Sequence, residues 1–169
     1  GYADSESIHV SFIIDIRADG LSASDFASVK SEIDAFAKRA YLYERDLVVH
    51  LLTQSETNFE KAAYKIVGEY KSYDDISNAL SKIKQESKGY IFGGCCNISE
   101  ALNAAIGLSE PAAKNYIFDV YAQENAIYEY DIADMLSAEI RADDITIGII
   151  SEYEDSFIGY QQELLTTSR

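Results

Sequence analysis

The sequence is poor in the residues that mark several protein classes. It contains two cysteines, one proline and no tryptophan among 169 residues. Two cysteines are too few for a disulfide scaffold, and the adjacent pair Cys95 and Cys96 matches no zinc-binding spacing. The cysteine content therefore excludes a disulfide-rich domain, and it fits both a cytoplasmic protein and a surface protein with few disulfides.

Long apolar runs and positive charge are also scarce. No stretch of about 18 apolar residues is present, so we expect no membrane insertion in this segment. The chain has 14 Lys and Arg residues against 29 Asp and Glu residues, a formal net charge of −15. Nucleic acids and anionic membrane surfaces are bound by clustered basic residues, so neither is an expected partner. The charge is compatible with a cation or a basic protein partner.

Apolar, β-branched runs predict five strands, at residues 9–16, 46–53, 62–70, 115–121 and 144–151. Helical spacing of apolar residues predicts helices at about 25–40, from 73 onward, at about 99–108 and 127–142, and from 152 onward. We expect one domain over residues 1–169, with residues 1–7 as a flexible, acidic N-terminal segment unlike a signal peptide.

This order of elements predicts an α/β fold. Residues 54–61 are too few for a helical crossover, so the second and third strands should pair antiparallel. The other strands alternate with helices, which predicts a mostly parallel sheet. We therefore expect a three-layer α/β/α sandwich with one antiparallel edge strand, and we find no convincing sixth strand after the fifth.

Charged residues gather where the first strand ends. The segment Ser11-Phe12-Ile13-Ile14-Asp15-Ile16-Arg17-Ala18-Asp19-Gly20 runs from a buried strand into an acidic turn. Ligands of open α/β sheets bind beyond the carboxyl ends of the strands. Asp15, Arg17 and Asp19 are therefore candidate binding residues.

Two later segments bring further candidates to the same region. Gly93-Gly94-Cys95-Cys96-Asn97-Ile98-Ser99-Glu100-Ala101-Leu102 reads as a loop that enters a helix N-terminus, where backbone N–H groups are available to a ligand. Asp119 lies in the fourth predicted strand. Cys96, Asn97 and Asp119 join the candidate binding residues.

These segments and the element order resemble a von Willebrand factor A domain, over about residues 8–151. In that family the first strand ends in Asp-x-Ser-x-Ser, a Gly-Gly-Thr-Asn-Ile-Gly-Glu-Ala-Leu segment opens a later helix, and an Asp follows the fourth strand. The resemblance implies a Rossmann-like fold and a divalent-cation site, the metal-ion-dependent adhesion site. Its ligands here would be Asp15, Asp19 and Asp119, with Mg²⁺ or Mn²⁺ as the ion.

The metal-binding pattern departs from the family at several positions. Arg17 and Asp19 stand at the two Ser positions, Cys96 stands at the Thr position, and the third ligand position falls at Asp119 or at Tyr121. Hard divalent cations require oxygen ligands, and a guanidinium and a thiol supply none. We expect Arg17 to lie against Asp15 and Asp19 and to replace the metal charge, so that no cofactor is needed. The alternative places Arg17 in solvent and leaves a weak carboxylate site.

The resemblance implies a non-enzymatic protein-binding or adhesion module with a protein ligand, within a larger surface or secreted protein. An extracellular or cell-surface location follows from it, with the cytoplasm as the alternative. The oligomeric state is left open.

A rival hypothesis is a cysteine hydrolase of the isochorismatase-like type. That family also places an Asp at the end of the first strand and a nucleophilic Cys at a helix N-terminus, here Cys95 or Cys96. It also needs a Lys between them, and Lys65 in the expected hairpin is a poor fit. No Gly-x-Gly-x-x-Gly, P-loop or Gly-x-Ser-x-Gly motif is present, which argues against nucleotide binding and serine hydrolysis.

Overall fold

Strand β1 (Ile8–Asp15) occupies the centre of a five-stranded sheet with the order β3-β2-β1-β4-β5. The computed structural model describes residues 7–18, 20–43, 46–55, 64–87, 98–120 and 145–150. The other described elements are α1 (Ala23–Leu42), β2 (Leu47–Gln54), β3 (Tyr64–Tyr70), α2 (Tyr73–Lys82), α3 (Ile98–Gly107), β4 (Lys114–Val120) and β5 (Ile145–Ile150).

The pairing of the strands confirms the predicted sheet. β1 pairs parallel with β2 and with β4, and β4 pairs parallel with β5. β3 pairs antiparallel with β2 and ends the sheet on that side, with a register shift between Leu51 and Leu52 of β2. The antiparallel edge strand was expected because the preceding connection is too short for a crossover helix.

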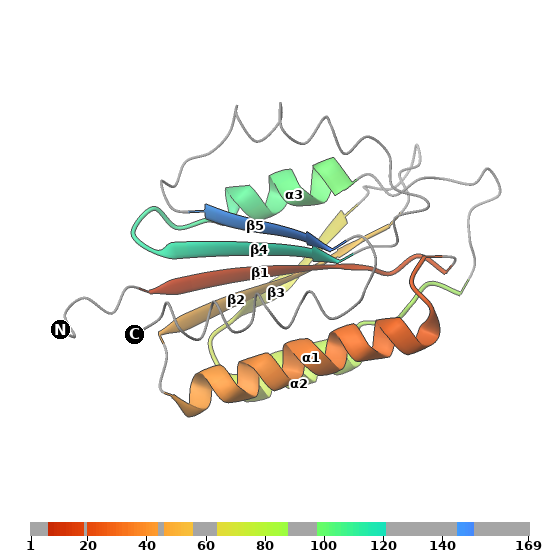
Figure 1. Ribbon diagram of the computed structural model, residues 1–169, viewed down its shortest axis with the longest axis horizontal. Helices are drawn as coiled ribbons and strands as arrows, with labels where there is room; N and C mark the ends of the chain where they lie inside the picture. Colours follow the sequence, from red (N-terminus) through yellow and green to blue (C-terminus); the bar gives the residue numbers. More distant parts are fainter. Residues whose placement is uncertain are drawn as a thin grey trace.

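Helices cover both faces of the sheet, which gives the expected three layers. α1 and α2 lie on one face and α3 lies on the other (Figure 1). α1 begins at an N-cap, where the Ser22 side chain accepts a hydrogen bond from the Asp25 backbone N–H at 3.0 Å. Its buried stripe contains the six residues that helical spacing predicts: Phe26, Val29, Ile33, Phe36, Ala37 and Ala40.

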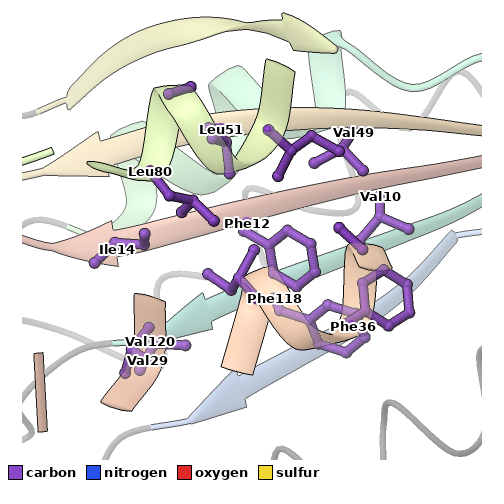
Figure 2. Packing of buried hydrophobic residues seen from close by; sticks show 14 of the residues in the cluster. Val10, Phe12, Ile14, Val29, Phe36, Val49, Leu51, Leu80, Phe118 and Val120 are labelled. Atoms are coloured by element: carbon purple, nitrogen blue, oxygen red, sulfur yellow. The ribbon is translucent and has the colours of Figure 1, made fainter. Parts of the chain in front are cut away.

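The alternation of side chains along β1 divides the core between the two faces. Val10, Phe12 and Ile14 point into the larger cluster under α1 and α2, where the Phe12 ring lies 5.7 Å from the Phe118 ring (Figure 2). Ile13 points to the opposite face, into a smaller cluster with α3. Because successive strand residues point to opposite faces, Asp15 lies on the α3 face, next to Ile13 in that row.

Several predictions fall outside the described residues. The expected helices at 127–142 and after 152 lie there, and so do residues 1–6 of the segment 1–7, whose expected flexibility is therefore not tested. Strand and helix ends in the described ranges differ from the predicted ends by one or two residues, which is the ordinary uncertainty of such boundaries. No described helix is long and apolar enough to cross a membrane.

Candidate functional site

The candidate site lies where β1, β2 and β4 end, and we call this region the carboxyl edge. It is defined by Asp15 of β1, Gln54 of β2 and Asp119 of β4. The chain leaves β1 toward β2 on one side, whereas β4 adds on the other side. This reversal is the topological switch point at which open α/β sheets bind ligands.

Asp15 and Arg17 form a buried ion pair at the carboxyl edge. The Arg17 Nη2 atom lies 2.6 Å from Asp15 Oδ2, and the Nε atom lies 3.0 Å from Oδ1. The Arg17 backbone N–H also donates to Oδ1, at 3.0 Å. The side chains are 0% exposed for Asp15 and 1% exposed for Arg17. A two-pronged guanidinium contact of this kind is among the strong charge-assisted hydrogen bonds.

The turn after β1 holds this pair in place. The Gly20 backbone N–H donates to the Arg17 carbonyl at 3.2 Å, which closes a tight turn. A Cβ atom at Gly20 would lie 2.8 Å from Asp15 Oδ2, closer than real Cβ contacts. The position therefore requires glycine because the backbone passes directly beside the carboxylate.

A neighbouring segment closes the carboxyl edge from the α2 side. The Glu86 backbone N–H donates to the Ile16 carbonyl at 2.8 Å, and the Gln85 amide donates to the Leu21 carbonyl at 2.7 Å. The Ser55 hydroxyl donates to the Glu86 carboxylate. These contacts connect the ends of β1 and β2 to the residues after α2.

Asp119 lies inside β4, as its place in the predicted strand indicates, and its Cα is paired with that of Ile13. The Gln54 amide Nε2–H donates to Asp119 Oδ1. Gln54 Oε1 and Asp119 Oδ2 are buried and accept no hydrogen bond from the described residues.

The environment of Asp119 favours its neutral form. Burial raises its pKa well above the ordinary value, the hydrogen bond from Gln54 opposes this rise, and the charge of Asp15 adds to it. The side chain is 0% exposed. A neutral carboxyl group beside a carboxamide is a poor ligand for a divalent cation.

The described part of the carboxyl edge does not fit a divalent cation. The Asp15 carboxylate is held by a guanidinium, whose positive charge would repel the ion, and burial raises the pKa of Asp119, which accepts a hydrogen bond from Gln54. The described residues contain no group of three His, Cys, Asp or Glu side chains that could hold a metal. Both Asp15 carboxylate oxygens and Asp119 Oδ1 accept hydrogen bonds from internal partners, whereas Asp119 Oδ2 and Gln54 Oε1 accept none from the described residues.

The predicted site residues therefore divide into three groups: a pair in contact, a residue with another partner, and residues outside the described ranges. Asp15 and Arg17 are in contact as expected, which contradicts the alternative that Arg17 points to solvent. Asp119 lies on the same edge but contacts Gln54. Asp19, Cys96 and Asn97 lie outside the described residues, as does Tyr121.

Sequence reasoning missed Gln54. The second strand was predicted to end at Thr53, which left Gln54 in the connection, whereas β2 includes it and the structure buries it to 1% exposure. The parallel pairing of β1 with β2 could have identified Gln54. In that pairing Gln54 lies opposite Asp15, the last residue of β1.

The residues of the hydrolase hypothesis can be placed in part. Asp15 is engaged by Arg17, and Lys65 is exposed on β3. Cys95 and Cys96 lie outside the described residues.

Comparisons with known proteins give a likeness of fold. No family model matches the chain, and no curated protein matches it. Among solved structures, the pilus adhesin SpaC from Lactobacillus rhamnosus GG is similar in two crystal structures. One aligns with a TM-score of 0.53 at 12% identity over 68% of this chain, and its open conformation aligns with a TM-score of 0.48 at 16% identity over 68%. The chain spans 15% and 14% of those adhesin chains.

Proposed function

We propose that this chain is a non-enzymatic protein-binding module of the von Willebrand factor A type that binds its ligand without a metal bridge. It would belong to a larger surface or secreted protein and use the carboxyl edge as its interaction face. The observation that carries the proposal is the buried Arg17 guanidinium on Asp15, at the position where the family's metal site begins.

The physical argument concerns charge. A divalent cation in this fold would balance strand-end carboxylates and leave a free coordination position for a partner's carboxylate. Here one internal cation balances Asp15, and both are nine-tenths or more buried. A partner would therefore bind the rim around the pair through shape and hydrogen bonds, because no metal coordination position is offered.

The fold likeness to a pilus adhesin supports an adhesion-type role and a cell-surface or extracellular location.

The test uses two exposed serines on the rim. Ser24 lies in the first turn of α1, which follows the turn after β1, and Ser87 follows the segment that contacts Ile16. Surface-protein extracts would be passed over the immobilised domain, the retained protein purified, and its affinity measured by biolayer interferometry. Ser24→Arg with Ser87→Arg should abolish binding, and EDTA should leave the wild-type affinity unchanged.

The matched control carries the same two substitutions elsewhere. Ser31→Arg with Ser81→Arg places them on the exposed faces of α1 and α2, and binding should be retained. Loss of binding in EDTA would overturn the metal-independent mechanism. Equal binding by both serine variants would overturn the assignment of the carboxyl edge. Rapid alkylation of Cys95 or Cys96 at low pH would instead favour the hydrolase hypothesis.

A further inference from the structure

A groove of about 680 Å³ lies between β3 and α2 and reaches the carboxyl edge at Ile16 and Thr53. Its apolar lining comes from Ile16, Val67, Ala79 and Ile83. The volume is in the range of sites that take a short peptide segment or a small ligand. The groove therefore offers an apolar floor next to β3, the edge strand of the sheet.

The charges around the groove are separated along its length. Three lysines line one end of the groove. Lys65 lies at the start of β3, Lys82 lies in the last turn of α2, and Lys84 follows that helix. All three side chains are exposed. We call this the basic end of the groove. In a chain of net charge −15, three of the 14 basic residues gather at this one place.

The opposite end carries negative charge. Asp75 lies in the first turn of α2 and lines the groove together with Glu69. The Glu69 carboxylate lies 3.2 Å from His50 Nε2, and burial lowers the pKa of that histidine. Among the described residues that line the groove, positive charge therefore gathers at one end and negative charge at the other.

A further basic residue, Lys30, lies near Lys84. The pKa of Lys30, on the neighbouring helix α1, is lowered by burial and by the positive charge of Lys84. The Lys30 Nζ atom donates to the Ile83 carbonyl at 2.8 Å, so it is held at the end of α2. A ligand carboxylate at this position would offset the repulsion between Lys30 and Lys84, which favours the binding of an acidic ligand.

Addition of a partner strand along β3 is disfavoured. β3 carries a register irregularity opposite Leu51 and Leu52, and it exposes Lys65. Irregular pairing and edge lysines are devices that prevent strand addition. A ligand in the groove is therefore recognised through side chains rather than through a continued sheet.

We propose that this groove binds an acidic segment of a partner protein, with an Asp or Glu side chain at the basic end and an adjacent aliphatic side chain on the apolar floor. The groove borders the proposed interaction face at Ile16, but its lysines and its apolar floor are not used in the proposed function, so the proposal holds whether or not the carboxyl edge binds a ligand. Charge complementarity and the apolar floor together select this occupant over a purely anionic small molecule.

The experiment starts from a phage library of random linear peptides selected on the intact chain. Selected peptides should be enriched in Asp or Glu next to Leu, Ile or Val. Their labelled synthetic forms would be titrated by fluorescence anisotropy, and amide shifts in ¹⁵N-NMR should map to β3 and α2. Lys82→Glu with Lys84→Glu should weaken binding by at least about tenfold, because two attractive contacts become repulsive.

Two control variants separate charge from folding. Lys38→Glu with Arg39→Glu makes the same charge change on the exposed face of α1 and should leave affinity unchanged. Lys82→Arg with Lys84→Arg keeps the charge and should retain binding. Equal weakening by the α1 variant would overturn the proposal, since it would indicate a long-range effect of net charge.

Three further outcomes would overturn it. Peptides without acidic enrichment would remove the electrostatic basis of recognition. Full competition by millimolar inorganic phosphate would indicate a simple anion site. Analytical ultracentrifugation would test for self-association. If the wild type self-associates and Lys82→Glu with Lys84→Glu does not, the occupant of the groove is a second copy of this acidic chain.

Discussion

Gln54 of β2 donates a hydrogen bond to Asp119 of β4 across β1, the strand that lies between them. Both side chains are buried, and each keeps one oxygen that accepts no hydrogen bond from the described residues. A proton on Asp119 Oδ2 would satisfy both atoms, because it would be donated to Gln54 Oε1. The pair would then form a closed ring of two hydrogen bonds.

The first prediction concerns Asp119→Asn and pH. The pKa of Asp119 is raised in the folded state, so its contribution to stability is full below the unfolded pKa, about 3.9, and is lost as pH rises toward the folded pKa. An Asn amide would pair with Gln54 at every pH. The variant should therefore become more stable than the wild type as pH rises from about 4 to 7, by about 1.4 kcal/mol for each unit of pKa shift.

Urea denaturation at a series of pH values measures the difference in the free energy of unfolding between Asp119→Asn and the wild type. Asp46→Asn is the control, because it removes an equal charge from an exposed position. A gap between Asp119→Asn and the wild type that stays constant over this pH range would contradict a raised pKa.

The second prediction is a double-mutant cycle on the buried ion pair. Arg17→Met removes the guanidinium that balances Asp15 and should cost about 3–5 kcal/mol of the free energy of unfolding. Asp15→Asn should destabilise the protein in the same way. The double variant should lose less than the sum of the two, because neither charge is then left without the other. Additive losses in chemical denaturation would indicate that the contact contributes nothing.

The third prediction uses two glycines. Gly20→Ala places a Cβ atom against the Asp15 carboxylate and should destabilise the protein by about 1–3 kcal/mol. Gly107→Ala is the matched control, because a Cβ atom there meets nothing within 4 Å and lies in α3. It should be neutral or stabilise by up to about 1 kcal/mol, as alanine favours helix. Thermal denaturation should rank Gly107→Ala, wild type and Gly20→Ala in falling order.

The fourth prediction concerns cation binding. If the proposed von Willebrand factor A relationship holds, Arg17→Ser with Asp19→Ser removes the internal cation and introduces the two hydroxyls that the family carries after its first-strand Asp. Calorimetric titration with Mg²⁺ or Mn²⁺ should then give saturable heat, and the ion at 100 times its Kd should stabilise the variant by about 2.7 kcal/mol. The wild type and Asp19→Ser alone should give no heat. Absence of heat in the double variant would contradict the placement of the family's metal site here.

The fold was predictable because its signals are local. The buried runs of β1, β2 and β4 and the stripe of α1 follow from apolar spacing, and the antiparallel pairing of β3 follows from a short connection. The contact of Arg17 with Asp15 could also be predicted, since a cation two residues from a buried carboxylate has few other partners.

The partner of Asp119 could not be predicted in the same way. It depends on which strands flank β1 and on their register, so Gln54 and Asp119, 65 residues apart, meet only in the folded sheet. The predicted end of β2, at Thr53, falls one residue before the observed end for a similar reason. A polar Gln looks like a connection residue until its neighbour in β1 is known.

The proximity of Asp15 and Arg17 in the chain has one more consequence. A metal site in this fold would be assembled from three distant segments and would need an ion from the surroundings. The Asp15–Arg17 pair closes a loop of two residues, for which the entropic cost is small. The charge of Asp15 is thus balanced from within the chain as soon as this strand end forms, and a chelator should leave that balance unchanged.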